Sequence, residues 1–234
     1  RPMYFASWWK LTKPFSSGSL IKRVVPQAKI FFPIILSTAS KIFELWTTLF
    51  IKNPDEKGFV SFHQDAKYIG LEPHNWVTAW VAITDSNETN GCMKMWAGTH
   101  KNEIKHHNQK FDENNLLTRG QTIENVPISE TTPVILKAGQ MSLHHPAVIH
   151  GSGLNKSKER RIGFVIQSYI GTNVNQVLGK MYVQLARGED LFNYHEKAER
   201  PNQLMNKKDI ILRQKANEEL SKIFYLDSEK KGKY

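Results

Sequence analysis

A succession of short, strand-like segments separated by turn residues most constrains the fold of this chain. Residues 44–51 are rich in aromatic and β-branched side chains and stop at an Asn-Pro-Asp turn. Further strands are predicted at 59–68, 76–84, 93–96, 134–136, 141–150 and 161–170. Many short strands with turn signals between them favour a barrel or a sandwich. Apolar spacing predicts a helix over 207–224, packed outside this β core.

The length of 234 residues suffices for one well-buried domain and is short for two. We therefore expect a single domain over 1–234, with an irregular basic segment at 1–44, a β core at about 45–190 and a helical tail at about 195–234. The lone cysteine, Cys92, excludes an intramolecular disulfide and a multi-cysteine zinc site. It suits a reducing compartment, so a cytoplasmic location is expected.

No stretch approaches the roughly 20 apolar residues that span a bilayer, so no membrane span is expected. The apolar run at 30–36 is short, is broken by Pro33 and lacks the small-residue cleavage pattern of a signal peptide.

The formal net charge of +10 gathers at the ends of the chain. Residues 1–52 hold eight Lys/Arg against one acid, a net of +7. A basic periphery attracts nucleic acid, an anionic membrane or an acidic substrate, or it is simply a solvated surface. The aromatic residues do not interleave with the basic ones as in an RNA-recognition sheet, so nucleic acid is not an expected partner. The basic N-terminal region weakly favours an anionic small-molecule substrate.

The residues that carry the chemistry begin with His63 and Asp65. Alternate side chains of a strand share a face, so both point the same way if 59–68 is extended. His150, at the end of the strand predicted for 141–150, is the best candidate for a third metal ligand. Two histidines and one carboxylate, with the opposite side of the metal open, suit non-haem Fe(II) oxygenases. A lone His-x-Asp is more often structural, so the metal-site interpretation depends on the other candidate site residues that accompany it.

Arg161, at the start of the next predicted strand, is a further candidate site residue that supports the metal-site interpretation. Alternation puts it on the small and polar face of that strand, with Gly163, Val165, Gln167 and Tyr169. A buried guanidinium needs a partner, and a dicarboxylate such as 2-oxoglutarate can supply one through a bidentate pair. The alternative is a surface arginine at a strand end, which describes the neighbouring Arg160 better.

The whole set of motifs resembles the phytanoyl-CoA dioxygenase family. The resemblance covers roughly residues 45–190 and runs in the order of the family. It includes His63-Gln64-Asp65, the run from Trp76 to Trp80, the turn from Thr89 to Met93, Ala97-Gly98-Thr99-His100, and the run from His145 to Gly153 followed by Arg161. It implies a mainly β fold, a double-stranded β-helix (jelly-roll, cupin-like) with flanking helices. It also implies an Fe(II)- and 2-oxoglutarate-dependent dioxygenase that consumes O2 and hydroxylates a small organic substrate.

The resemblance also implies a role for each site residue. His63, Asp65 and His150 would be the iron ligands. Arg161 would hold the distal carboxylate of 2-oxoglutarate with help from Ser152, and Trp80 would line the co-substrate pocket. Halogenating relatives replace the carboxylate ligand with a small residue, so the presence of Asp65 favours hydroxylation over chlorination.

The other histidines carry weaker expectations. His145 matches a family position, where it would orient the metal ligands without binding the metal itself. His100 is interpreted as structural. We expect His106, His107 and His144 at the surface or in ordinary packing.

Several alternatives stay open. The same ligands could bind zinc or manganese in a hydrolase or isomerase. The same fold could belong to a non-catalytic binding module. The basic charge at the chain ends is also compatible with a nucleic-acid-binding protein. The helical region that precedes the family's core is not recognisable in 1–40, and 101–130 is predicted to be an insertion or lid. Substrate identity and oligomeric state do not follow from the sequence.

Overall fold

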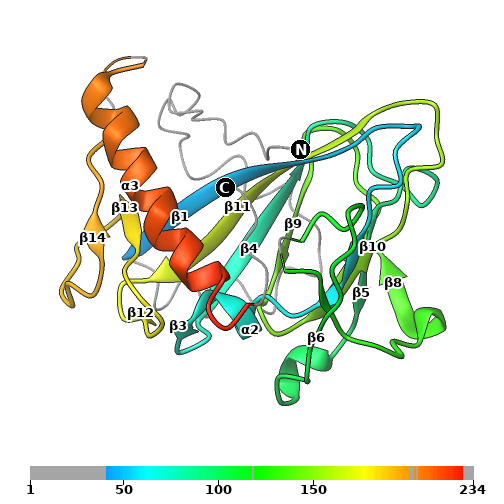
Figure 1. Cartoon of the computed structure of the whole chain (residues 1–234), viewed down its shortest axis with the longest axis horizontal. Helices are drawn as coiled ribbons and strands as arrows, with labels where there is room; N and C mark the ends of the chain where they lie inside the picture. Colours follow the sequence, from blue (N-terminus) through cyan, green and yellow to red (C-terminus); the bar gives the residue numbers. More distant parts are fainter. Residues whose placement is uncertain (1–40, 118, 201–202, 204, 229–234) are drawn as a thin grey trace.

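The computed structural model describes residues 41–117, 119–200, 203 and 205–228 (Figure 1). Its elements are β1 (Ile42–Lys52), β2 (Val60–His63), α2 (Ala66–Ile69), β3 (Leu71–Glu72), β4 (Trp76–Ala82), β5 (Met93–Trp96), η3 (Thr99–Lys101), β6 (Asn108–Gln109), β7 (Gln121–Thr122), η4 (Ile128–Glu130), β8 (Thr131–Pro133), β9 (Met141–His144), β10 (Ile149–Ser152), β11 (Arg161–Gly171), β12 (Asn175–Gln176), β13 (Tyr182–Arg187), β14 (Glu196–Lys197) and α3 (Lys207–Phe224).

Two main sheets form the body of the protein. One has six strands in the order β14-β13-β1-β11-β4-β9, and the other has four in the order β2-β10-β5-β8. Almost all neighbouring strands are antiparallel, and side chains from both sheets line one cavity. The predicted mainly β fold, a double-stranded β-helix with flanking helices, is confirmed.

The longest ladder joins β1 to β11 and fixes one end of the site. Its antiparallel register runs from Ile42 opposite Gly171 to Lys52 opposite Arg161. Directly opposite residues have Cβ atoms about 5 Å apart, so this register brings two cationic side chains together at one end of the ladder.

Three predicted strands differ from the observed ones. The strand expected over 59–68 ends at His63, and α2 follows it almost at once. The strand expected over 141–150 is two strands in different sheets, because Pro146 lacks the N–H that a continuous ladder needs. The strand expected at 134–136 lies instead at 131–133, and only Leu136 of the predicted segment forms an isolated bridge, with Ser86.

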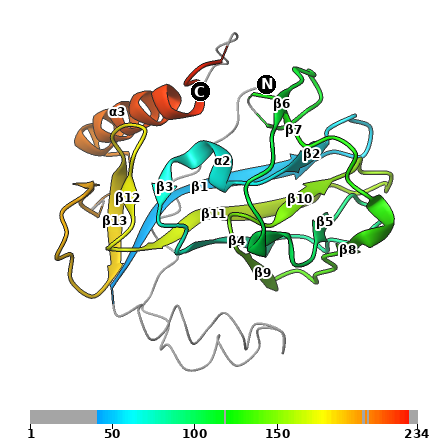
Figure 2. The same ribbon diagram turned by 90° about the horizontal axis from the view of Figure 1, so that it is seen from below.

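A helix covers one end of the six-stranded sheet. Asn206 caps α3 by accepting a hydrogen bond from the Lys208 N–H at 2.9 Å, which satisfies a donor that the first helical turn leaves unpaired. The helix buries Leu220 and Ile223 in a cluster with Phe43, Trp76 and other side chains of the sheet. Each fully buried aliphatic side chain contributes about 1.5–3 kcal/mol, so this face anchors the helix predicted for 207–224. Figure 2 shows α3 beside β12 and β13.

Two further expectations concern segments at the periphery. The basic segment 1–44 lies almost wholly outside the described residues. The segment 101–130, predicted to be an insertion or lid, carries only short elements, and its Leu116, Leu117 and Gln121 line the cavity. Within the described part of the chain, no helix is both long and apolar enough to cross a bilayer.

Candidate active site

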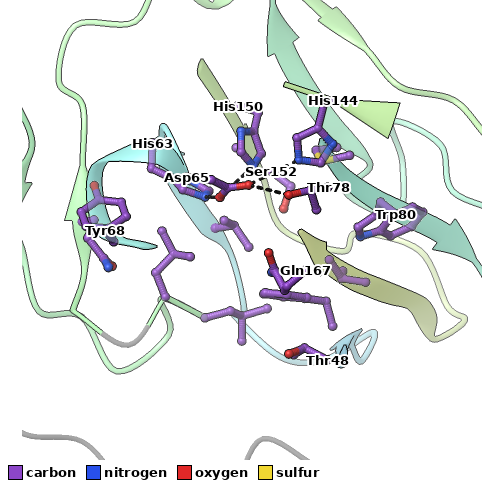
Figure 3. Close-up of a pocket in the computed structure, with 18 of the residues that line it drawn as sticks. Thr48, His63, Asp65, Tyr68, Thr78, Trp80, His144, His150, Ser152 and Gln167 are labelled. Atoms are coloured by element: carbon purple, nitrogen blue, oxygen red, sulfur yellow. Dashed lines mark hydrogen bonds and ion pairs between the residues drawn. The ribbon is translucent and has the colours of Figure 1, made fainter. Parts of the chain in front are cut away.

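The three predicted metal-binding residues come together in the structure (Figure 3). His63 and His150 are direct partners in the antiparallel register of β2 and β10. Asp65 Oδ1 lies 3.3 Å from His63 Nε2 and 3.9 Å from His150 Nε2. One potential ligand atom from each residue falls within 4.8 Å of the others, and all three residues are buried. This arrangement can hold one metal ion.

Hydrogen bonds to the backbone fix both imidazole rings in the form that a metal requires. His63 Nδ1 lies 2.9 Å from the Ser61 carbonyl oxygen, and His150 Nδ1 lies 3.0 Å from that of Val148. A carbonyl only accepts, so each Nδ1 carries the hydrogen and each Nε2 presents its lone pair. Burial, followed by the neighbouring His63, lowers the pKa of His150 to about 3, which keeps this ring neutral and ready to bind.

Asp65 is held as a carboxylate with one oxygen directed to the histidines. Burial alone would raise its pKa, but His150, His144 and His63 outweigh burial and hold the pKa well below its usual range. Thr78 Oγ1 donates to Asp65 Oδ2 at 3.0 Å. The hydrogen bond occupies Oδ2, so Oδ1 is the oxygen left facing the two Nε2 atoms.

The predicted reason for the pairing of His63 with Asp65 is wrong, although the pairing itself is present. Asp65 is not on an extended strand; it precedes α2 with helical angles, φ −57° and ψ −38°. A turn brings the Asp65 side chain back toward His63, and two hydrogen bonds of the Gln64 side chain stabilise that turn. The Gln64 Nε2 group donates to the Ala147 carbonyl at 2.7 Å, and its Oε1 accepts from the Lys105 N–H at 2.9 Å.

Arg161 lines the same cavity as the candidate metal ligands, and the buried Lys52 lies beside it against Ser152. Arg161 is buried as expected, and its guanidinium lies over the indole of Trp80, 5.3 Å from the ring centre. The Nζ group of Lys52 donates to Ser152 Oγ at 2.7 Å and to the Gly153 carbonyl. The predicted set of Arg161, Ser152 and Trp80 is thus contiguous, and Lys52 extends it.

Neither cation has an anionic partner in the part of the chain that the structure describes. Arg161 Nε is a buried donor without an acceptor, and no ion pair joins either cation to a carboxylate of the described residues. Burial, with the neighbouring Arg161, lowers the pKa of Lys52 to about 6. Uncompensated buried charge is costly. An incoming carboxylate would remove that cost.

Gly163 explains how Trp80 reaches its position. A Cβ atom on this glycine would lie 2.0 Å from Cζ2 of the Trp80 ring, so the indole packs directly on the glycine backbone. Val165, two residues along β11, is the cross-strand partner of Trp80. The alternation predicted for this strand holds as far as Gln167, which lines the cavity, and then shifts at Ser168, where φ is 65°.

Sequence reasoning missed two residues of the site, one in the cavity wall and one beside it. His144 is not a surface or ordinary packing residue: its Nε2 lies 3.7 Å from Asp65 Oδ2, and neither ring nitrogen has a hydrogen-bond partner. Only the position of β9 beside β4 reveals this. Lys52 was the other omission. Alternation along β1 would have grouped it with Thr48 and Phe50, which line the cavity, and its amine reaches Ser152 of the cavity wall.

The remaining histidines lie away from the three ligand atoms. His145 shapes the turn between β9 and β10, where its Nδ1 accepts from the Ala147 N–H at 3.1 Å. His100 lies in η3 and His106 is exposed. His107 is buried and hydrogen-bonded to the backbone, with Nε2 accepting from the Gln64 N–H at 2.9 Å. The supporting role expected for His145 stays a prediction.

A family model described as phytanoyl-CoA dioxygenase (PhyH) matches residues 18–163. The chain belongs to the phytanoyl-CoA dioxygenase family. The peroxisomal phytanoyl-CoA dioxygenase of Mus musculus is 32% identical over 126 residues, which cover 52% of this chain and 37% of that protein. A probable alpha-ketoglutarate-dependent hypophosphite dioxygenase of Stutzerimonas stutzeri is 28% identical over 122 residues, 51% of this chain and 42% of that one.

Among solved structures, the non-heme monooxygenase ThoJ superposes on this phytanoyl-CoA dioxygenase family member with a TM-score of 0.71. The identity is 27%, and the match covers 83% of this chain and 71% of that chain. The curated relatives are longer, since the match covers well under half of each.

The cofactors of the phytanoyl-CoA dioxygenase family, iron and 2-oxoglutarate, fit the residues of this cavity. Two imidazole nitrogens and a carboxylate oxygen on one side of a metal suit Fe(II) and leave its other positions open. The unpaired Nε of Arg161 and the buried amine of Lys52, which a bound carboxylate would help to protonate, suit a carboxylate group.

Proposed function

We propose that this protein is an Fe(II)- and 2-oxoglutarate-dependent dioxygenase that hydroxylates a small organic substrate and converts 2-oxoglutarate to succinate and CO2. The observation that carries the proposal is the presence of both halves of such a site in one cavity. A His-Asp-His cluster forms one half, and Arg161, with Lys52 beside it on Ser152, forms the other, without a carboxylate partner among the described residues.

Each half has its own task in this proposal. His63, Asp65 and His150 hold the iron, with Thr78 fixing the orientation of the carboxylate. Arg161 and Lys52 bind the distal carboxylate of 2-oxoglutarate beside Ser152. When bound, the iron and 2-oxoglutarate supply the O2 activation that inserts oxygen into a C–H bond.

The protein walls keep this chemistry dry and aligned. Trp80, Val165 and Met93 give the cavity an apolar side, which limits water near the reacting groups. The cavity measures about 120 Å³, so it suits a small reacting portion of a substrate. Hydroxylation rather than chlorination is favoured because Asp65 occupies the carboxylate position of the cluster. The cytoplasmic location expected from the lone cysteine stays a prediction, since the mouse relative is named as peroxisomal.

The proposal is tested by anaerobic titration of the purified protein with Fe(II) and then 2-oxoglutarate. Chelation of iron by the 2-oxo acid gives a weak visible charge-transfer band. We expect the band in the wild-type protein and a weakened or absent band in Asp65→Ala and Arg161→Ala. Arg160→Ala is the matched control, because Arg160 is the exposed neighbour that hydrogen-bonds to Asn53.

The absence of the band in iron-loaded wild-type protein would refute the proposal. A metal-dependent hydrolase or isomerase, or a non-catalytic binding module, would then replace it. If the band forms, succinate release coupled to a candidate substrate separates turnover from mere binding.

A further inference from the structure

A second cavity of about 240 Å³ adjoins the one that holds the His-Asp-His cluster. The two cavities share Tyr68 and Gln121 as wall residues. The second cavity also has two cations in its lining, Lys67 and Arg119, and one acid, Asp227. Neither cation forms an ion pair with that acid within 4.0 Å among the residues that the structure describes.

Two polar atoms, one at the shared wall and one next to it in the second cavity, are buried without hydrogen-bond partners among the described residues. They are the hydroxyl of Tyr68 and the Nε group of Arg119, whose guanidinium lies 6.0 Å from the centre of the Tyr68 ring. Burial raises the pKa of Tyr68, so its hydroxyl remains a donor. A buried donor that finds no acceptor costs free energy, which indicates that a ligand supplies the acceptor.

The neighbouring His107 cannot play the same part, because both of its nitrogens are engaged. Its Nε2 accepts from the Gln64 N–H, and its Nδ1 donates to the Lys105 carbonyl at 2.8 Å. The imidazole instead packs edge-on against Tyr68, with the ring centres 5.1 Å apart. It therefore holds the Tyr68 ring in place and leaves the hydroxyl and Arg119 as the donors.

Tyr68 and the co-substrate residues lie on different sides of the metal-binding cluster. In Figure 3, Tyr68 lies beyond His63 on one side of Asp65, and Trp80 lies on the other side. Arg161 packs on Trp80, so 2-oxoglutarate would occupy that second side. The side lined by Tyr68 and Arg119 remains for the substrate that is oxidised.

We propose that the oxidised substrate carries an anionic oxygen group, a carboxylate or a phosphate, that Arg119 and Tyr68 bind at the wall between the two cavities. The carbon portion next to this group then extends toward His63, Asp65 and His150. Lys67, which is exposed, adds positive potential at the outer cavity. This inference rests on the proposed function, because it names the substrate class of that site.

The test is calorimetric titration of the protein with hexanoate, hexyl phosphate and hexanol, under anaerobic conditions with Fe(II) and saturating 2-oxoglutarate. We expect at least one anion to bind and hexanol to bind far more weakly. Arg119→Met should weaken anion binding by about tenfold to a hundredfold, as expected for loss of a charged hydrogen bond, and Tyr68→Phe by less. Arg160→Met, which removes the same charge from an exposed site, should bind the anions as the wild type does.

Each remaining outcome decides the inference. Preference for hexyl phosphate assigns a phosphate substrate, and preference for hexanoate assigns a carboxylate. Equal binding of hexanol, unchanged anion binding by Arg119→Met, or an equal loss in Arg160→Met would overturn it. Thermal unfolding and the charge-transfer band of each variant check that the fold and the first cavity are intact.

Failure of the proposed function gives a different pattern. The same titrations on metal-free protein probe Arg119 and Tyr68 without iron. Anion binding there that depends on Arg119, with no charge-transfer band, would leave the anion site standing and remove the dioxygenase assignment.

Discussion

His63 and His150 face each other across two hydrogen-bonded strands, with their ring centres 4.3 Å apart. The spacing between neighbouring strands sets this separation, so the 87-residue separation in sequence does not loosen it. The carbonyls that orient the two rings belong to Ser61 within β2 and to Val148 just before β10. The four-stranded sheet thus positions the two histidines, and the turn before α2 adds Asp65.

Thr78 is expected to tune metal binding through Asp65. Thr78→Val keeps the shape but removes the hydrogen bond to Oδ2, so the carboxylate loses its fixed orientation. Metal affinity should fall about tenfold to a hundredfold, as is typical of partners that orient ligands. Thr78→Ser restores the hydroxyl and should recover most of the affinity. Competitive titration with a chromophoric chelator measures it, and equal affinities of the valine and serine variants would contradict this role.

Lys52 should take up a proton when 2-oxoglutarate binds. Its pKa of about 6 leaves it largely neutral at pH 7.5, and an incoming carboxylate raises that pKa and favours the ammonium form. The affinity for 2-oxoglutarate should therefore fall as pH rises above about 6, the pKa of Lys52. Calorimetry of metal-loaded protein in buffers of different ionisation enthalpy counts the protons. Uptake should approach one proton in the wild type and be nearly lost in Lys52→Met; release of protons by the wild type would refute the assignment.

Gly163 should be needed for the position of Trp80. In Gly163→Ala the new Cβ would collide with the indole, so either the ring or the strand must move. Overpacking of this kind costs about 1–3 kcal/mol of unfolding free energy. The variant should also bind 2-oxoglutarate more weakly, because Trp80 supports Arg161. Denaturant unfolding and the charge-transfer band measure the two effects. Gly58→Ala is the control, since its Cβ would meet only ordinary contacts from 3.7 Å; equal effects in both variants would rule out a specific role.

His144 should adjust the metal centre without being one of its ligands. His144→Phe keeps a buried aromatic ring next to His150 but removes the nitrogen 3.7 Å from Asp65 Oδ2. We expect metal affinity to change by less than about tenfold, whereas Asp65→Ala should lose far more. The charge-transfer band should persist at a shifted wavelength in the phenylalanine variant. Complete loss of the band in a folded His144→Phe protein would mean that His144 is itself a ligand.

Much of the fold followed from local patterns. The strands around β1, β4, β5 and β11 and the helix α3 were predicted because each has a clear period of apolar residues. The two strand predictions that were wrong in extent share a cause. Residues 59–68 and 141–150 read as continuous strands, but tertiary packing turns the chain after His63 and at Pro146. A turn that is stabilised by distant groups, such as Gln64 on Ala147, leaves no periodic signal.

The sequence by itself determined which chemical groups are present for a metal site and an anion site. The residue types at 63, 65, 150 and 161, together with the family resemblance, predicted a metal cluster and an arginine for an anion. Only the tertiary structure decided that His144 lines the cavity, that Lys52 reaches Ser152 beside it and that Asp65 enters it from a helical turn. The physical reason is register and sheet assignment: Lys52 meets Arg161 only through the β1–β11 ladder, and His144 reaches Asp65 only because β9 pairs with β4.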